Sequence, residues 1–101
     1  MKPLIVHSDA EAELWAEVEY YEQRAPGLGL DFLSEAERAF TRILGSPARW
    51  PHAAHGTQVV LLRRFPHSVY YRDLPAAVWI IAIAAQKRRP HYWRSRGRGE
   101  P

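Results

Sequence analysis

Basic and aromatic side chains alternate near the end of this chain. They are Lys87, Arg88, Arg89, His91, Tyr92, Trp93 and Arg94. Guanidinium and ammonium groups attract phosphates or carboxylates, and aromatic rings among them stack on bases or anchor a protein interface. Three earlier cations, Arg63, Arg64 and Arg72, occur in or beside predicted strands. We therefore expect these residues to form one basic patch across an edge of a sheet.

The composition of this patch fits two kinds of chemistry. A ribonuclease would use the cations to bind a phosphate and stabilise the phosphorane, with His91 and Tyr92 as acid and base. A binding module would need only the charges and the aromatic rings. A solvated C-terminus would carry the same charges without either role.

Three other groups of polar residues have simpler explanations. Consecutive residues 7–9, His-Ser-Asp, cannot converge as a catalytic triad, and Ser8 has the spacing of a helix cap. His52 and His55 lack the further ligands that a metal site needs, so we expect no metal. The acidic residues Asp9, Glu13 and Glu17 share a helix face that we expect to be solvated.

Length and composition favour one folded domain. The chain has 101 residues, of which 47% are hydrophobic and 25% charged. It contains no cysteine, which excludes disulfides, thiolate metal sites and a cysteine nucleophile. The longest apolar run, near residues 76–85, is about half of a membrane-spanning helix, so we expect a cytoplasmic protein without a membrane partner. Residues 1–37 hold nine acidic and two basic residues, whereas residues 38–101 hold two acidic and twelve basic ones.

Hydrophobic periodicity predicts the order β-α-α-β-β-β. Residues 4–6 read as a strand, two helical patterns follow on either side of the loop 26–29, and strands are predicted at 59–65, 68–74 and 78–85. The helical hairpin should pack on a small, mainly antiparallel sheet, giving an α+β fold. We expect the large aromatic residues Trp15, Phe32, Phe40 and Trp79 in the core. Residues 1–96 should form the domain, and residues 97–101 should fray.

Three segments resemble one known protein family. The segments LLRRFPHSVYYR (61–72), VWIIAIAAQKRRPHYWRSR (78–96) and YYEQRAPGLGLDFLSEAERAF (20–40) are similar to the RelE/ParE superfamily of bacterial type II toxins, in its ParE-like or plasmid-stabilisation branch. The resemblance implies the β-α-α-β-β-β fold and a toxin that arrests growth. It also implies an antitoxin, encoded beside the toxin, that holds it inactive in a hetero-oligomer, and no cofactor.

The family contains two activities, and the residues favour one of them. RelE-like members cut mRNA on the ribosome, using lysines before the hairpin turn, an arginine after it, an arginine beyond the last strand and often a terminal tyrosine. Here Val59 and Leu61 occupy the lysine places and Ser68 occupies the first arginine place, while Arg88 matches the second. The resemblance therefore favours a ParE-like toxin that inhibits DNA gyrase without being a nuclease.

Two alternatives remain open at this stage. The first is a ribosome-dependent endoribonuclease that uses Arg72, Arg88, His91 and Tyr92. The second is a silent relative that only binds its antitoxin. In the favoured reading, contacts with the target or the antitoxin are made by Arg63, Arg64, Arg72, Lys87, Arg88, Arg89, Tyr92, Trp93 and Arg94.

Overall fold

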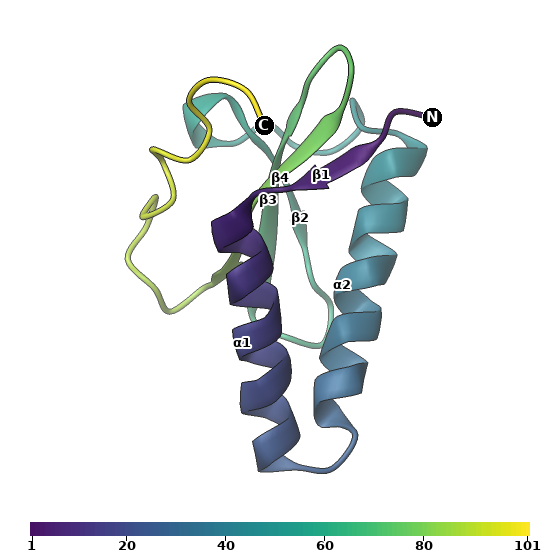
Figure 1. Cartoon of the computed structure of the whole chain (residues 1–101), viewed down its shortest axis with the longest axis vertical. Coiled ribbons are helices and arrows are strands. Elements are labelled where there is room, and N and C mark those ends of the chain that lie inside the picture. The colour runs from purple at the N-terminus through teal and green to yellow at the C-terminus, as the bar shows by residue number, and fades with distance from the viewer.

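Two helices cover one face of a four-stranded sheet (Figure 1). The computed structural model describes all residues, 1–101. The elements follow the predicted order: β1 (Leu4–Val6), α1 (Ser8–Arg24), α2 (Leu28–Gly45), a short 3-10 turn (Ala54–Gly56), β2 (Gln58–Leu61), β3 (His67–Asp73) and β4 (Val78–Ala85). This arrangement confirms the predicted α+β class. Neither helix is long and apolar enough to cross a membrane.

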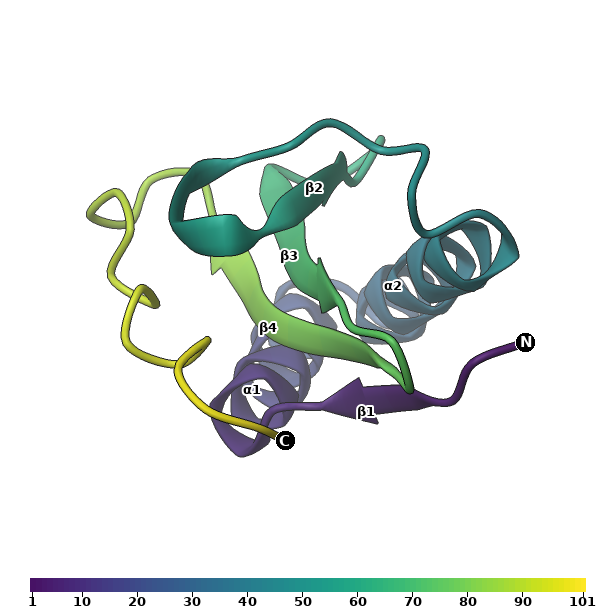
Figure 2. The ribbon, with the colours of Figure 1, turned by 90° about the horizontal axis from the view of Figure 1, so that it is seen from above.

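The sheet has the order β1-β4-β3-β2, so the last strand lies inside it (Figure 2). The strands β2, β3 and β4 form an antiparallel meander, and β1 pairs in parallel with β4. The pairing with β1 extends only from Val78 to Ile80. Beyond Ile80, no strand pairs with that side of β4.

A close turn joins the helices of the hairpin. Gly27 has φ 87°, a left-handed conformation that glycine adopts without strain. A Cβ atom at Gly29 would lie 2.4 Å from the Val18 carbonyl oxygen, so only glycine fits where α2 crosses α1. The Glu22 carboxylate accepts hydrogen bonds from the backbone N–H groups of both glycines. The sequence Pro-Gly-Leu-Gly therefore sets the angle at which the helices return.

Strand β4 is buried on both faces, as its continuous apolar sequence predicted. Its inner residues, such as Ile80 and Ile83, pack under the helices with Phe32 and Val69. Ile81 is an extra residue opposite the Tyr70–Tyr71 step, where the ladder shifts register. A second cluster lies on the outer face and consists of Trp79, Ile81, Ala82, Ala84 and Trp93. These hydrophobic side chains on the outer face must be shielded from water, and the C-terminal residues shield them.

Three local predictions were wrong. The helix cap is His7, whose Nδ1 accepts from the N–H of Asp9, and Ser8 is already helical. Trp15 is 51% exposed, because Leu14 and Val18 form the stripe that faces the core. The strand predicted at 59–65 ends at Leu61, since the N–H groups of Arg63 and Arg64 bind a carboxylate of α2 in place of a neighbouring strand. Phe32 and Trp79 are buried as predicted, and Phe40 packs against the core.

A substitution at Tyr71 tests how much its buried hydroxyl contributes to the stability of the core. This hydroxyl donates to the Pro47 carbonyl, which also accepts from Gln58 Nε2, so Tyr71→Phe removes one of two hydrogen bonds there and should lower the free energy of unfolding by about 1 kcal/mol. Burial, followed by the charge of Asp73, raises the pKa of Tyr71 from 10.0 to about 12. The unfolded chain loses this proton first, so the contribution is complete below pH 10 and is lost as the pH rises towards 12.

Urea unfolding at several pH values measures both effects. The Phe variant should show a smaller alkaline loss of stability than the parent protein. Tyr20→Phe, at an exposed hydroxyl, is the control and should change little. An identical alkaline decline in the Tyr71 variant and the parent would contradict this account.

Candidate interaction sites

The C-terminal tail, defined here as residues 86–98, runs beside β4 on the side where α1 begins (Figure 2). Trp93 anchors it. This side chain is only 2% exposed and packs on Tyr70, with the ring centroids 4.3 Å apart. The tail therefore buries the outer face of the sheet as part of the fold, and Trp93 is a structural residue within it.

The carboxylate of Glu13 on α1 ties the tail to the sheet. It accepts from the backbone N–H of Ile83 at 3.1 Å, from both Arg96 Nη atoms at 2.9 and 3.1 Å, and from the Tyr92 hydroxyl. Arg96 also donates to the Ile81 carbonyl at 3.3 Å. On the unpaired side of β4, a helix carboxylate thus satisfies the Ile83 N–H and a tail arginine satisfies the Ile81 C=O.

This network fixes the protonation of its members. Burial, then the hydrogen bond and charge of Glu13, raises the pKa of Tyr92 above its usual value. Burial lowers the pKa of Arg96, but the hydrogen bond and charge of Glu13 outweigh it and raise the pKa overall. The Arg88 guanidinium lies 3.7 Å from the centre of the Tyr92 ring. Tyr92 is therefore a neutral phenol whose hydroxyl is already donated, which makes it a poor general base.

A hollow of about 210 Å³ lies between the tail and the outer face. Its polar and aromatic lining consists of Ser68, Tyr70, Gln86, Arg88, Arg89, His91, Tyr92 and Trp93. Arg72 lies outside this hollow, with its Nη1 donating to the Gly97 carbonyl at 2.5 Å. The hollow therefore brings together three of the four residues that a nuclease reading would use, without Arg72.

The other predicted contact residues have separate places. Lys87 lines a different hollow, beside the buried His67, whose Nε2 is hydrogen-bonded to Glu17. Arg94 is exposed and donates to the His91 carbonyl at 3.3 Å. The Gly97 carbonyl is held by Arg72, while the expected fraying of residues 97–101 stays a prediction.

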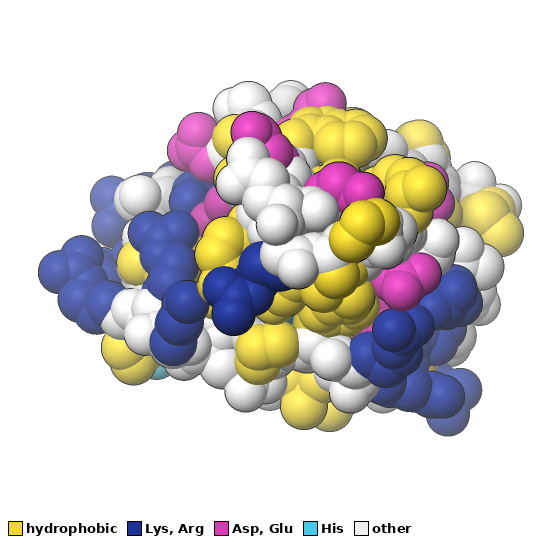
Figure 3. Space-filling view, turned by 90° about the horizontal axis from the view of Figure 1, so that it is seen from below, with side chains coloured by type: hydrophobic (Ala, Val, Ile, Leu, Met, Phe, Trp, Pro, Cys, Tyr) yellow, Lys and Arg dark blue, Asp and Glu magenta, His cyan; other side chains and the backbone are white.

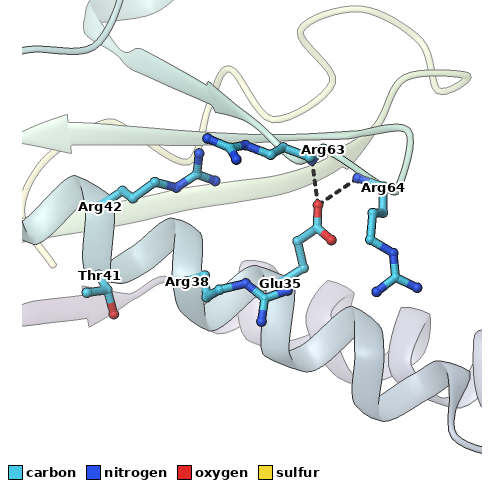
Figure 4. A pocket seen from close by; sticks show the side chains of 6 residues that line it. All are labelled: Glu35, Arg38, Thr41, Arg42, Arg63 and Arg64. Carbon is cyan, nitrogen blue, oxygen red and sulfur yellow. Dashed lines mark hydrogen bonds between the residues drawn. The ribbon is translucent and has the colours of Figure 1, made fainter.

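Arg63 and Arg64 belong to another group of cations. They line a hollow of about 440 Å³, called here the arginine pocket, whose lining residues are Glu35, Arg38, Thr41, Arg42, Arg63 and Arg64 (Figure 4). Figure 3 shows basic side chains gathered at two sides of the lower face, with hydrophobic and neutral side chains between them. The structure thus divides the expected single basic patch into two regions, at the tail and at the arginine pocket.

Two carboxylates that hold these regions were missed from the sequence. Glu13 was assigned to a solvated helix face, and Glu35 was not singled out. Glu35 is 3% exposed, and its Oε1 accepts from the N–H groups of Arg63 at 2.5 Å and Arg64 at 2.7 Å. One feature of the sequence could have indicated the role of Glu13. The predicted first strand is much shorter than the predicted last strand, so part of β4 has no strand partner.

The two loop histidines, His52 and His55, make separate contacts. His52 forms an isolated bridge with Gln58, and the His55 ring packs against His91 and Trp93. The structure contains no group of three or more histidine, aspartate or glutamate residues arranged to hold a metal ion.

One solved structure shares this fold over most of its length. The chain is similar to a chain of the "Chromosomal ParDE TA system from P. aeruginosa", with a TM-score of 0.74 and 20% sequence identity. The match covers 84% of this chain and 96% of the other. No protein-family model matches the sequence, and no curated protein matches it either. The structural likeness establishes a ParE-like fold, as the resemblance of the sequence implied.

Removal of the Glu13 charge should loosen the tail. Glu13→Gln weakens the contacts with Arg96 and Arg88 and should cost about 1.5–3 kcal/mol of stability, the usual worth of a charged hydrogen bond. Trypsin should then cut after Arg88 and Arg94 several times faster, because the tail leaves the sheet more often. Glu11→Gln, at an exposed position of the same helix, is the matched control. Equal cleavage rates in the two variants would show that Glu13 does not hold the tail.

Proposed function

We propose that this chain is the toxin of a type II toxin–antitoxin module. It arrests bacterial growth in the cytoplasm by binding an essential target, DNA gyrase first among the candidates, and a cognate antitoxin neutralises it. The observation that carries the proposal is the ParE-like fold, shared over 84% of the chain with a ParDE TA system. The resemblance of residues 61–72 and 78–96 to RelE/ParE toxins is independent support.

The state of Tyr92 favours a binding toxin over a nuclease. Its hydroxyl is donated to Glu13, and its pKa is raised, so it is poorly suited to remove a proton from an RNA 2′-hydroxyl. Val59, Leu61 and Ser68 stand where nuclease relatives carry cations. A transition state with extra negative charge on phosphorus would find few fixed cations on this part of the sheet.

The hollow beside the tail keeps the nuclease as the second candidate. Arg88, His91 and Tyr92 line it together, and a phosphate placed there would meet a guanidinium, an imidazole and a phenol. This reading requires Tyr92 to leave Glu13 when RNA binds.

A pulse of expression without the antitoxin separates the candidates. Transcript ends and chromosomal breaks are read from the same cells within minutes. Under the gyrase proposal, we expect breaks with intact transcripts, in the parent and in Tyr92→Phe alike.

Tyr20→Phe is the matched control, because it removes an exposed tyrosine hydroxyl and leaves Arg88, His91 and Tyr92 in place. New 5′ ends inside codons that persist in Tyr20→Phe and vanish in Tyr92→Phe or Arg88→Ala would establish the nuclease instead. Normal growth without breaks or cuts would indicate a silent relative that only binds an antitoxin.

We further propose that the antitoxin covers the tail with an acidic segment. The tail carries exposed cations at Lys87, Arg88, Arg89 and Arg94. Complementary charge speeds association and gives specificity. Deleting residues 87–98 would also remove Trp93 from Tyr70, so substitution of exposed arginines is the cleaner change.

Arg89→Ser with Arg94→Ser should weaken antitoxin binding about tenfold or more at low salt, and less at high salt. Binding is measured by titration of the co-expressed, separated antitoxin at several salt concentrations. Arg24→Ser with Arg49→Ser removes the same charge from exposed positions outside the tail. Unchanged affinity in the tail variant at every salt concentration would refute the tail as the docking surface.

A further inference from the structure

The arginine pocket concentrates positive charge without matching negative partners. Arg38, Arg42 and Arg63 line it, and none of these guanidinium groups forms a salt bridge within 4 Å of a carboxylate. The fourth, Arg64, reaches only Asp31, at 3.5 Å and at a largely exposed position. Figure 4 shows the Arg42 and Arg63 side chains extending towards one another, one from α2 and one from the segment after β2.

Bringing these cations together has an energetic cost. Arg38 and Arg42 are four residues apart on α2, a spacing at which like charges destabilise a helix. The Glu35 carboxylate offsets part of the repulsion, but its Oε1 is occupied by the N–H groups of Arg63 and Arg64, and its Oε2 is buried. Glu35 thus fixes the backbone of the two loop arginines and leaves their guanidinium groups available.

We propose that the arginine pocket binds a backbone phosphate of a nucleic-acid duplex. Guanidinium groups from two elements approach the hollow from opposite sides, an arrangement that suits a tetrahedral group with oxygens on several sides. A carboxylate carries its two oxygens in one plane, whereas a phosphate directs oxygens to several sides at once.

The lining of the pocket distinguishes among the possible carriers of a negative group. No hydrophobic side chain lines it, whereas grooves that bind peptides add apolar pockets for side chains. No aromatic ring lines it either, so it offers nothing on which an exposed base could stack. At about 440 Å³ it is open and wide, with both nearby loop N–H groups already used, unlike a closed cradle for free phosphate. A duplex, which presents phosphates outside and hides its bases, fits these features.

The test is binding of the purified full-length protein to a short labelled DNA duplex, followed by fluorescence anisotropy across salt concentrations. Arg38→Gln with Arg63→Gln should weaken binding about tenfold at low salt and reduce the salt slope by about one, the effect of losing one phosphate contact. Arg24→Gln with Arg98→Gln removes equal charge from exposed residues outside the pocket and should have a much smaller effect. Equal losses in the two double variants would overturn the proposal, because binding would then follow net charge alone.

Glu35→Gln gives a change of opposite sign. The amide oxygen can still accept from the loop N–H groups, but the negative charge is gone, so duplex binding should tighten several-fold. Weaker binding in this variant, with thermal unfolding unchanged, would contradict the proposal.

Competition experiments identify which negatively charged molecule the arginine pocket binds. They do not depend on toxin activity. An excess of unlabelled duplex should displace the labelled one at concentrations where polyglutamate and inorganic phosphate do not. The Nε–Hε NMR signals of Arg38, Arg42 and Arg63 should shift with the duplex. Shifts of these signals with polyglutamate or phosphate alone, at equal concentration, would assign the pocket to an acidic protein or to free phosphate and overturn the proposal.

Discussion

The Glu13 carboxylate connects helix α1, strand β4 and the C-terminal tail. Strand β1 is only three residues long because α1 begins two residues after it, and this leaves one side of β4 without a strand partner beyond Ile80. Unpaired backbone groups in a buried strand are costly. Glu13 satisfies the Ile83 N–H, and Arg96 satisfies the Ile81 carbonyl. The same ion pair holds the tail, so Trp93 covers the outer face only because the edge of β4 is capped in this way.

A second carboxylate, Glu35, plays the corresponding role on the other side of the molecule. It pulls the chain after Leu61 out of the ladder and towards α2, which ends β2 after four residues. Each basic region therefore has an acidic residue of the helical hairpin at its base. The acidic first third of the sequence is, in part, the internal counter-charge that allows the arginines of the last two thirds to gather.

The strands, the helices and their order could be predicted because their signals are local. The two helical stripes, the Pro-Gly break and the continuous apolar run of β4 each specify an element from its own residues. The errors occurred where a distant residue decides the outcome. Arg63 and Arg64 continue the alternation of β2, yet a carboxylate 28 residues earlier takes the N–H of Arg63. The sequence pattern around Glu13 is typical of a solvated helix, and that around Trp93 is typical of a docking surface. The topology of the sheet shows that Trp93 is buried and that Glu13 is partly buried against β4 and the tail.

The position of β4 also has a consequence for how a cell makes this protein. The strand β4, which lies inside the sheet, is the last of the four strands in sequence order. The helical hairpin can form early from local contacts, but β1 must wait for a partner more than seventy residues away. The sheet, the capped edge and the tail can therefore form only once β4 has been synthesised. Until β4 is present, the helical hairpin exposes the apolar face that packs on the sheet.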